Sequence, residues 1–334
     1  MLKREWTAFA CTKLPCAMCH ASSILPLDEH TLLCAFFGGS FEGKSDTAIW
    51  LARMTDGQSA EPVKLFSSNE AHWNPVLFTY PDGHIGIIFK VGDVIASWRS
   101  YVAESFDGGL TFSAPQELVK GDFGGRGPVR NQPLVLKEHC PGRYLSPASL
   151  EDGIWRAFAD ISDDGMRTFS KSNEVTLSKA ELNATDTSEK DIAVSAQSFK
   201  GRGVIQPTFW EDPDGVHMLL RSTAGFVMRS DSKDAGLTWC APYRTDVPNN
   251  NSGIDLDVLN GRIYLACNPV QGNWGQRSPI SLLSSDDGIH FVKEEDMDSE
   301  AAEFSYPCVN ACKGALYVSY TYKRQNIRVI KFTI

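Results

Sequence analysis

A short turn that recurs along the chain is the feature that most constrains the fold. Good copies, each with a serine, an aspartate, a glycine and an aromatic residue, occur at 105–112 (SFDGGLTF), 232–239 (SKDAGLTW) and 284–291 (SSDDGIHF). Weaker copies lie at 55–62 and 162–169. The aspartate can accept hydrogen bonds from the amides of its own turn, and the glycine suits a positive φ. Repetition at intervals of about 50 to 70 residues indicates an architecture of repeated units.

A second repeat, made of paired apolar segments, runs between these turns. The first segment of a pair often begins with polar residues and a proline, and the visible turns are D-G, N-G or K-G, which signal a hairpin. Six such first segments occur, at 19–27, 74–83, 131–136, 205–215, 252–261 and 306–314. Six four-stranded units around one axis predict an all-β, six-bladed β-propeller.

We expect residues 1–334 to form this propeller as a single domain, without a linker or a helix of consequence. The N-terminal segment around EWTAFACTKL should pair with C-terminal strands such as NIRVIKFTI and so complete the last unit. The polar stretch 177–198 is the one long insertion, and we expect it to form a loop over a face of the ring.

The composition excludes several classes of function. A formal net charge of −9 argues against nucleic acid or an anionic membrane as the partner. No apolar run approaches the roughly 18 residues that span a bilayer. The N-terminus shows no signal peptide and the nine cysteines suit a reducing compartment, so we expect a cytoplasmic protein. Cys16 and Cys19 lack a second pair that would complete a zinc site, so we expect no metal and no cofactor, and the oligomeric state stays open.

Polar side chains are expected to converge where the innermost strands begin and their neighbours end. The first strands contribute His20, His72, Asn74, Arg126, Arg130, Asn131, Gln206, Asn251 and Tyr306. The second strands and the loops after them contribute Glu42, Asp46, Lys90, Arg221, Asn268, Arg277 and Arg324. Several cations at one mouth predict an anion-binding pocket, because arginine suits bidentate contact with a carboxylate. Aromatic residues near the same loops, such as Trp73 and Trp274, could stack on a sugar ring.

With these features the chain resembles the sialidase (neuraminidase) superfamily, in which the repeated turns are called Asp boxes. The resemblance covers nearly the whole chain, from CHASSILPLDEHTLLCAFFGGSFEG to FSYPCVNACKGALYVSYTYKR. It implies that Tyr306 is the nucleophile, that Asp46 supplies acid and base chemistry, and that Arg221 and Arg277 hold a substrate carboxylate. A tyrosine nucleophile is the known exception to the two-carboxylate scheme of glycosidases.

The chain also departs from that family pattern. His20-Ala21-Ser22 stands where sialidases have Arg-Ile-Pro, and Gln206 replaces the glutamate that assists the tyrosine. An amide cannot take a proton from Tyr306 as a base.

Three functions therefore stay open. The first is an exo-acting glycoside hydrolase on a terminal acidic sugar of an oligosaccharide or glycoconjugate. The second is a lyase that cleaves next to a uronate, with His20 or His72 as the base and Tyr306 as the acid. His20 could equally be a hydrogen-bonding residue at a strand start, and His72 a packing partner of Trp73. The third is a glycan-binding protein without catalysis.

Overall fold

Antiparallel β-strands make up nearly all of the regular structure, so the predicted all-β class is confirmed. The computed structural model describes residues 2–123, 125–185 and 201–334. The first two sheets contain β2 (Met18–Pro26), β3 (Thr31–Gly39), β4 (Ala48–Thr55), β5 (Gln58–Ser59) and β6 (Val63–Phe66), and then β7 (His72–Thr79), β8 (Ile85–Val91), β9 (Arg99–Ser105) and β10 (Gln116–Glu117).

The next strands form one sheet of eight, in which two antiparallel groups are joined edge to edge. The first group is β11 (Leu134–Val135), β12 (Tyr144–Leu150), β13 (Ile154–Ser162) and β14 (Ser170–Lys171). The second is β15 (Arg202–Asp212), β16 (Gly215–Ser222), β17 (Phe226–Ser232) and β18 (Tyr243–Pro248). A parallel pairing of β13 with β15 connects them through two residue pairs only, Ile154 with Arg202 and Trp155 with Gly203.

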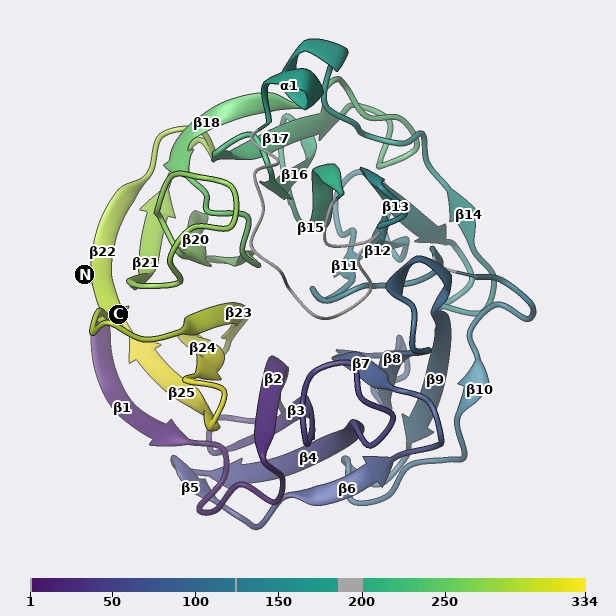
Figure 1. The fold of residues 1–334 in the computed structure, drawn as a ribbon, viewed down its shortest axis with the longest axis vertical. Coiled ribbons are helices and arrows are strands. Elements are labelled where there is room, and N and C mark those ends of the chain that lie inside the picture. The colour runs from purple at the N-terminus through teal and green to yellow at the C-terminus, as the bar shows by residue number, and fades with distance from the viewer. Residues whose placement is uncertain (1, 124, 186–200) are drawn as a thin grey trace.

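Two further sheets complete the chain. One is β19 (Asp255–Leu259), β20 (Arg262–Cys267), β21 (Ile280–Ser285) and β22 (Val292–Asp298). The other is β23 (Phe304–Cys312), β24 (Ala315–Tyr322), β25 (Asn326–Thr333) and β1 (Lys3–Phe9). The antiparallel pairing of β1 with β25 confirms the predicted contact between the two ends of the chain. Figure 1 shows the sheets following one another around a common centre, with β2, β7, β15 and β23 on the inside.

Four of the five repeated turns form the predicted hydrogen bonds. In the weak copy at 55–62 the Asp56 carboxylate instead contacts His30 at 2.7 Å. Asp234 accepts the Thr238 backbone N–H at 2.8 Å and its hydroxyl at 2.6 Å, and Gly236 has a φ of 86°. The weak copy at 162–169 has Met166 in the glycine position with a φ of 69°. Trp239, the aromatic residue of the 232–239 turn, is buried and stacks on Phe209 at 5.5 Å.

The inner strands share a β-bulge, which places residues of the central site. The register of β2, β7, β15 and β23 shifts at the same point of each strand. The bulge residues have positive φ although none is glycine: Ala21, Asn74, Gln206 and Tyr306, with Asn251 just before β19 in the same conformation. Bulges re-aim side chains and are common next to active sites. Here they turn a residue from several sheets toward the centre.

The long insertion contains the one α-helix of the described residues, α1 (Lys179–Ala184), which the sequence analysis did not expect. Ser178 caps it and Glu181 completes a capping box. The rest of the predicted loop, 186–198, lies outside the described residues. A short 3-10 helix, η1 (Ile95–Ser97), follows β8. Among the described residues, no helix has the length and apolar character to cross a membrane.

Candidate functional site

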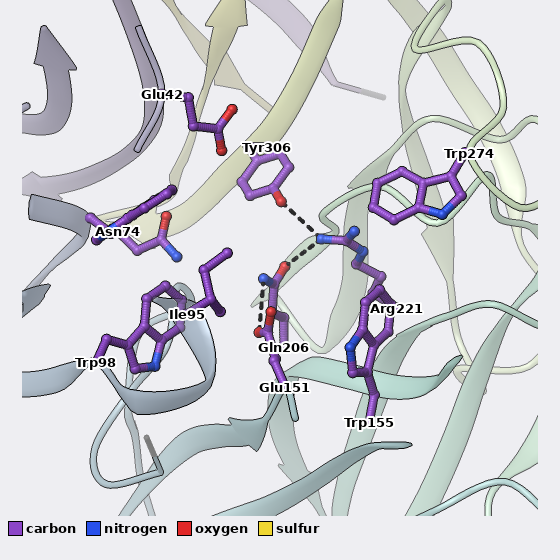
Figure 2. Close-up of a pocket in the computed structure, with 11 residues that line it drawn as sticks. Glu42, Asn74, Ile95, Trp98, Glu151, Trp155, Gln206, Arg221, Trp274 and Tyr306 are labelled. Atoms are coloured by element: carbon purple, nitrogen blue, oxygen red, sulfur yellow. Dashed lines mark hydrogen bonds between the residues drawn. The ribbon is translucent and has the colours of Figure 1, made fainter. Parts of the chain in front are cut away.

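A narrow pocket lies where the inner strands meet, and Figure 2 shows eleven side chains that line it. Five of them are predicted site residues: Glu42, Asn74, Gln206, Arg221 and Tyr306. The other six are Trp73, Ile95, Trp98, Glu151, Trp155 and Trp274. Tryptophans beside charged and amide groups form a lining that suits a polar ring-shaped ligand.

Arg221, near the end of β16, connects the polar groups of this pocket. Its Nη1 donates to the Tyr306 hydroxyl at 2.8 Å and to Gln206 Oε1 at 3.1 Å, and its Nε donates to Asn251 Oδ1 at 2.8 Å. Figure 2 shows the first two contacts converging on one guanidinium. The side chain is buried. Arg221 is therefore held in one orientation by three polar neighbours.

Aromatic rings fix the same guanidinium from its faces. The Arg221 Cζ lies 5.6 Å from the ring centroid of Trp155 and 5.8 Å from that of Trp274. These distances are in the range of cation–π attraction, which is stronger where water is excluded. The charge thus sits against apolar walls without being neutralised by them.

Tyr306 is surrounded by cations. The guanidinium carbons of Arg130, Arg221 and Arg277 lie 5.5, 5.7 and 5.5 Å from the centroid of its ring. The imidazole of His20 lies 4.2 Å from the same ring. Three arginines around one phenol make a surrounding that suits an anionic ligand. The predicted convergence of Tyr306 with Arg221 and Arg277 is thus present in the structure.

His20 is a buried, neutral imidazole next to Tyr306. Burial, together with the fields of Arg324 and Arg277, holds the pKa of His20 well below its usual range. Its Nδ1 lies 3.0 Å from the Thr321 hydroxyl. Its Nε2 has no hydrogen-bond partner among the described residues.

A chain of alternating charges ends at Glu42, which lines the pocket. Arg277 donates to Glu303 at 2.7 Å, Arg324 donates to Glu303 at 3.1 Å, and Arg324 also pairs with Glu42. Burial alone would raise the pKa of Glu303, but Arg277 and Arg324 outweigh it and hold this pKa at about 2. Arg324 is therefore engaged by two carboxylates, whereas no salt bridge to Arg221 or Arg130 is found within the described residues.

Glu151 is the one charged residue of the pocket lining that was not predicted from the sequence. It follows β12, as a second-strand end that matches the place of Arg221 on β16. It lines the pocket, and its Oε1 accepts from the Ser149 hydroxyl at 3.3 Å and from Gln206 Nε2 at 3.5 Å. Burial raises the pKa of Glu151, against the opposing effect of Arg221. The strand-end rule that selected Arg221 could have selected Glu151 as well.

Two of the predicted cationic side chains, those of Arg126 and Lys90, bind other groups of the protein. Arg126 pairs with the buried Asp160 at 3.0 Å. Lys90 is fully buried and donates to the Ser100 hydroxyl and the Arg126 carbonyl, both at 2.6 Å. Neither charge is presented to the pocket, because each is satisfied at the junction between sheets.

Arg130 and the remaining amides brace the centre. Arg130 is buried and donates to the carbonyl of Pro307 at 2.6 Å as well as contacting the ring of Tyr306. Asn268 donates to the carbonyls of Pro279 and Phe304 at 2.8 and 2.9 Å. Asn251 positions Arg221, as described above.

His72 and Asp46 are not among the residues that line the pocket. His72 stacks on Phe89 at 5.6 Å, and its Nδ1 lies 3.0 Å from the Glu70 carbonyl. Asp46 is exposed and accepts the backbone N–H and hydroxyl of Ser40 at 3.0 and 2.9 Å. The structure thus brings Tyr306, Arg221 and Gln206 together in the pocket lining. His20 and Arg277 lie next to the ring of Tyr306 without lining the pocket, and His72 and Asp46 belong to neither set.

The described residues contain no group of three or more histidines, cysteines, aspartates or glutamates placed to hold a metal ion.

Comparison with known proteins places this geometry in context. The family described as BNR repeat-like domain matches residues 30–318. No curated protein sequence matches the chain. A solved structure of a protein of unknown function from Dyadobacter fermentans is 15% identical, with a TM-score of 0.73 over 100% of this chain and 99% of that one.

Two solved sialidases are also similar. The Hadza microbial sialidase Hz136 is 14% identical with a TM-score of 0.71, covering 95% of this chain and 66% of that one. The Trypanosoma rangeli sialidase is 12% identical with a TM-score of 0.68, covering 94% of this chain and 54% of that one. The chain thus spans less than two thirds of either sialidase. At these identities the likeness concerns the fold.

Proposed function

The chain belongs to the BNR repeat-like domain family and has a sialidase-like fold, and from this premise we propose that it is an exo-acting glycoside hydrolase on a terminal acidic sugar. One observation carries the proposal. Tyr306 lies in a tryptophan-lined pocket with three guanidinium groups within 5.7 Å of its ring. Of the three, Arg221 lines the pocket and has no carboxylate partner among the described residues, whereas Arg277 already donates to Glu303. A substrate carboxylate is the group that Arg221 would recognise, and a sugar ring is what the indoles can stack on.

The scaffold that supports this site is, in our proposal, a single six-bladed propeller. Setting aside the two-residue pairing of β13 with β15 leaves six antiparallel groups of strands. The inner strands of four groups, β2, β7, β15 and β23, carry a bulge. A propeller presents residues from many blades at one end of its axis, which is how one small ligand can meet groups from β15, β16 and β23.

In the hydrolase, Arg221 and Arg277 would hold the carboxylate and Tyr306 would attack the anomeric carbon. The bond from Tyr306 Oη to that carbon forms as the bond to the leaving sugar oxygen breaks, and an ionisable group of the site takes the phenol proton while a proton is delivered to the leaving oxygen, so that no net proton is gained or lost. Water then cleaves the glycosyl–tyrosine bond. The phenol must lose its own proton in the first step. Gln206 cannot accept it, so the candidates for this role are Glu42 and Glu151 in the pocket lining and His20 beside the Tyr306 ring.

A lyase acting next to a uronate is the second candidate, and His20 favours it. A neutral imidazole with an unpartnered Nε2, next to a phenol, is a base paired with an acid. The base would take the proton beside the carboxylate, a carbon–carbon double bond would form, and Tyr306 would protonate the leaving oxygen. Gln206 is compatible with elimination, because Tyr306 acts there as an acid and needs no glutamate to remove its proton.

Incubation of the protein with sialyl-lactose and with rhamnose–glucuronate oligosaccharides separates these reactions. Release of sialic acid, detected by mass spectrometry, supports the hydrolase. A product with the ultraviolet absorbance of an unsaturated uronate rejects hydrolysis in favour of elimination. Tight binding of an acidic sugar that is recovered intact after long incubation would instead identify a glycan-binding protein.

A further inference from the structure

A carboxylate lies one contact away from the position where the sialidase pattern has its glutamate. Gln206 occupies that position on β15, and Glu151 follows β12 in the neighbouring group of strands. Both line the pocket, and Figure 2 shows the Gln206 amide between Glu151 and Arg221. We infer that Glu151 is the positioning residue of this site: it fixes the Gln206 amide, and through it the orientation of Arg221 toward Tyr306. The inference deepens the proposed function and rests on it for its catalytic consequence.

The two ends of the Gln206 amide have opposite partners. Arg221 Nη1 is a donor only, so the 3.1 Å contact requires the amide oxygen on that side. The amide nitrogen then faces Glu151 Oε1 at 3.5 Å. This contact is long for a hydrogen bond. Its acceptor is a buried carboxyl group, and electrostatic attraction is stronger in the interior because water does not screen it there. A flipped amide would place two donors face to face at Arg221.

Glu151 itself is held in place. The Ser149 hydroxyl donates to the same oxygen at 3.3 Å, and both residues are buried. Arg221 from β16 and Lys90 from β8 are the charged groups that favour its ionised form, while burial opposes it. Gln206 thus donates to Glu151 and accepts from Arg221, and the same Arg221 Nη1 also donates to the Tyr306 hydroxyl at 2.8 Å.

Protonation of Glu151 should disturb this series. A carboxyl group can donate to Gln206, which favours the flipped amide and leaves Arg221 without an acceptor there. The pKa of Glu151 is raised, so this change falls at higher pH than for an ordinary glutamate. Glu151→Gln keeps a carbonyl acceptor that cannot titrate, and Glu151→Leu removes the acceptor.

The test uses the full-length protein without substrate. Heteronuclear NMR follows the Arg221 Nε–H signal, assigned by its loss in Arg221→Lys, as the pH is lowered from neutral. We expect the chemical shift of this signal to change with pH in the wild type and to stay constant in Glu151→Gln. In Glu151→Leu the chemical shift should be close to the low-pH value of the wild type at every pH. Identical titration in the wild type and Glu151→Gln would overturn the inference.

A matched control removes a carboxylate elsewhere. Asp257 accepts the backbone N–H of Ala311 at 2.6 Å, and burial raises its pKa to about 6. Asp257→Asn should leave the Arg221 titration unchanged, and a loss of the titration in this variant would overturn the inference.

If a substrate is turned over, the kcat and KM of the Glu151 variants provide a second test. We expect Glu151→Leu to lower kcat by about 100-fold with little change in KM, as for a misplaced catalytic group. Glu151→Gln should restore most of kcat and lose the acid limb of the pH profile. An unchanged kcat in Glu151→Leu overturns the inference. If the wild type turns over no acidic sugar, the proposed function fails while the NMR titration still decides the role of Glu151.

Discussion

Tyr306 shows how backbone and side chain are combined at one residue. Its φ is 55°, which is unfavourable for a bulky side chain, and the bulge of β23 imposes it. The resulting direction lets the phenol meet Arg221 while Arg130 and Arg277 approach the ring. Such strain persists where the surrounding structure determines it, and it is concentrated at functional sites.

Removal of one atom tests this residue. Tyr306→Phe should lower kcat on an acidic glycan by about 1,000-fold, because either proposed reaction needs the phenol oxygen. The melting temperature should change by less than about 3 °C, since the half-buried ring is kept. Tyr317→Phe is the control, because its hydroxyl contacts the Glu29 carbonyl outside the pocket. A loss of several degrees in Tyr306→Phe, or full activity, would contradict the assignment.

The sequence could identify polar residues at strand ends but not the partners that occupy them. Tyr306, Arg221 and Gln206 were found because their segments repeat in a readable register. Arg126 looked equally available, yet its counterion Asp160 is on β13, 34 residues away, and no local pattern links them. The segment RYLSPASLE is predicted as a strand, and Glu151, the polar residue at its end, is absent from the predicted site residues.

At the scale of elements, the repeated turns are local structures held by one carboxylate each. Asp287 accepts the backbone N–H groups of Ile289 and His290, both at 2.8 Å. The sequence predicted these turns well because every partner lies within a few residues. Even Met166 adopts the positive φ of the glycine it replaces, which shows that the turn, and not the glycine, determines the conformation.

Asp287→Ala should lower the free energy of unfolding by about 2 kcal/mol, because several hydrogen bonds to a charged group are lost together. Catalysis at low temperature should be unaffected. The adjacent Asp286→Ala is the matched control, since Asp286 is exposed and has only a 3.6 Å contact with Arg262. Urea unfolding measures both variants, and equal stability of the two would contradict the role given to Asp287.

Strand β8 carries a buried charge whose effect can be measured by pH. Burial lowers the pKa of Lys90 to about 7, despite the nearby Asp160 and Glu151. As the pH rises, Lys90 therefore loses its proton at a lower pH in the native state than in the unfolded state. Stability from this group is present above the ordinary lysine pKa and is lost as pH falls through about 7.

Between about pH 7 and about pH 9, the wild type should thus gain about 2 kcal/mol of unfolding free energy relative to Lys90→Met. Urea unfolding at the two pH values gives this difference. A gain of the same size in the wild type and in the variant would show that Lys90 does not titrate in this range.

At the scale of the whole molecule, the two ends of the chain meet in one sheet. β1 pairs with β25 from Lys3 with Thr333 to Phe9 with Arg328, and Figure 1 shows both termini on the same side of the ring. The sequence predicted this contact because the last repeated unit lacks an outer strand of its own. It could not predict the parallel contact of β13 with β15, which involves two residue pairs without a recognisable pattern.

Deletion of residues 1–9 should lower the free energy of unfolding by about 3 kcal/mol or more, because the ladder to β25 is lost and an edge strand is exposed. The exposed edge should also promote self-association, measured by size-exclusion chromatography. A truncated protein that is monomeric and as stable as the full chain would contradict the closure by β1.

The central claim is that the pocket around Tyr306 recognises the carboxylate of a sugar. Calorimetric titration with N-acetylneuraminic acid and glucuronic acid, each compared with its methyl ester, tests this claim directly. We predict that at least one free acid binds about tenfold or more tightly than its ester, and that Arg221→Met abolishes the difference. Equal affinity of acid and ester for the wild-type protein, for both sugars, would contradict the account.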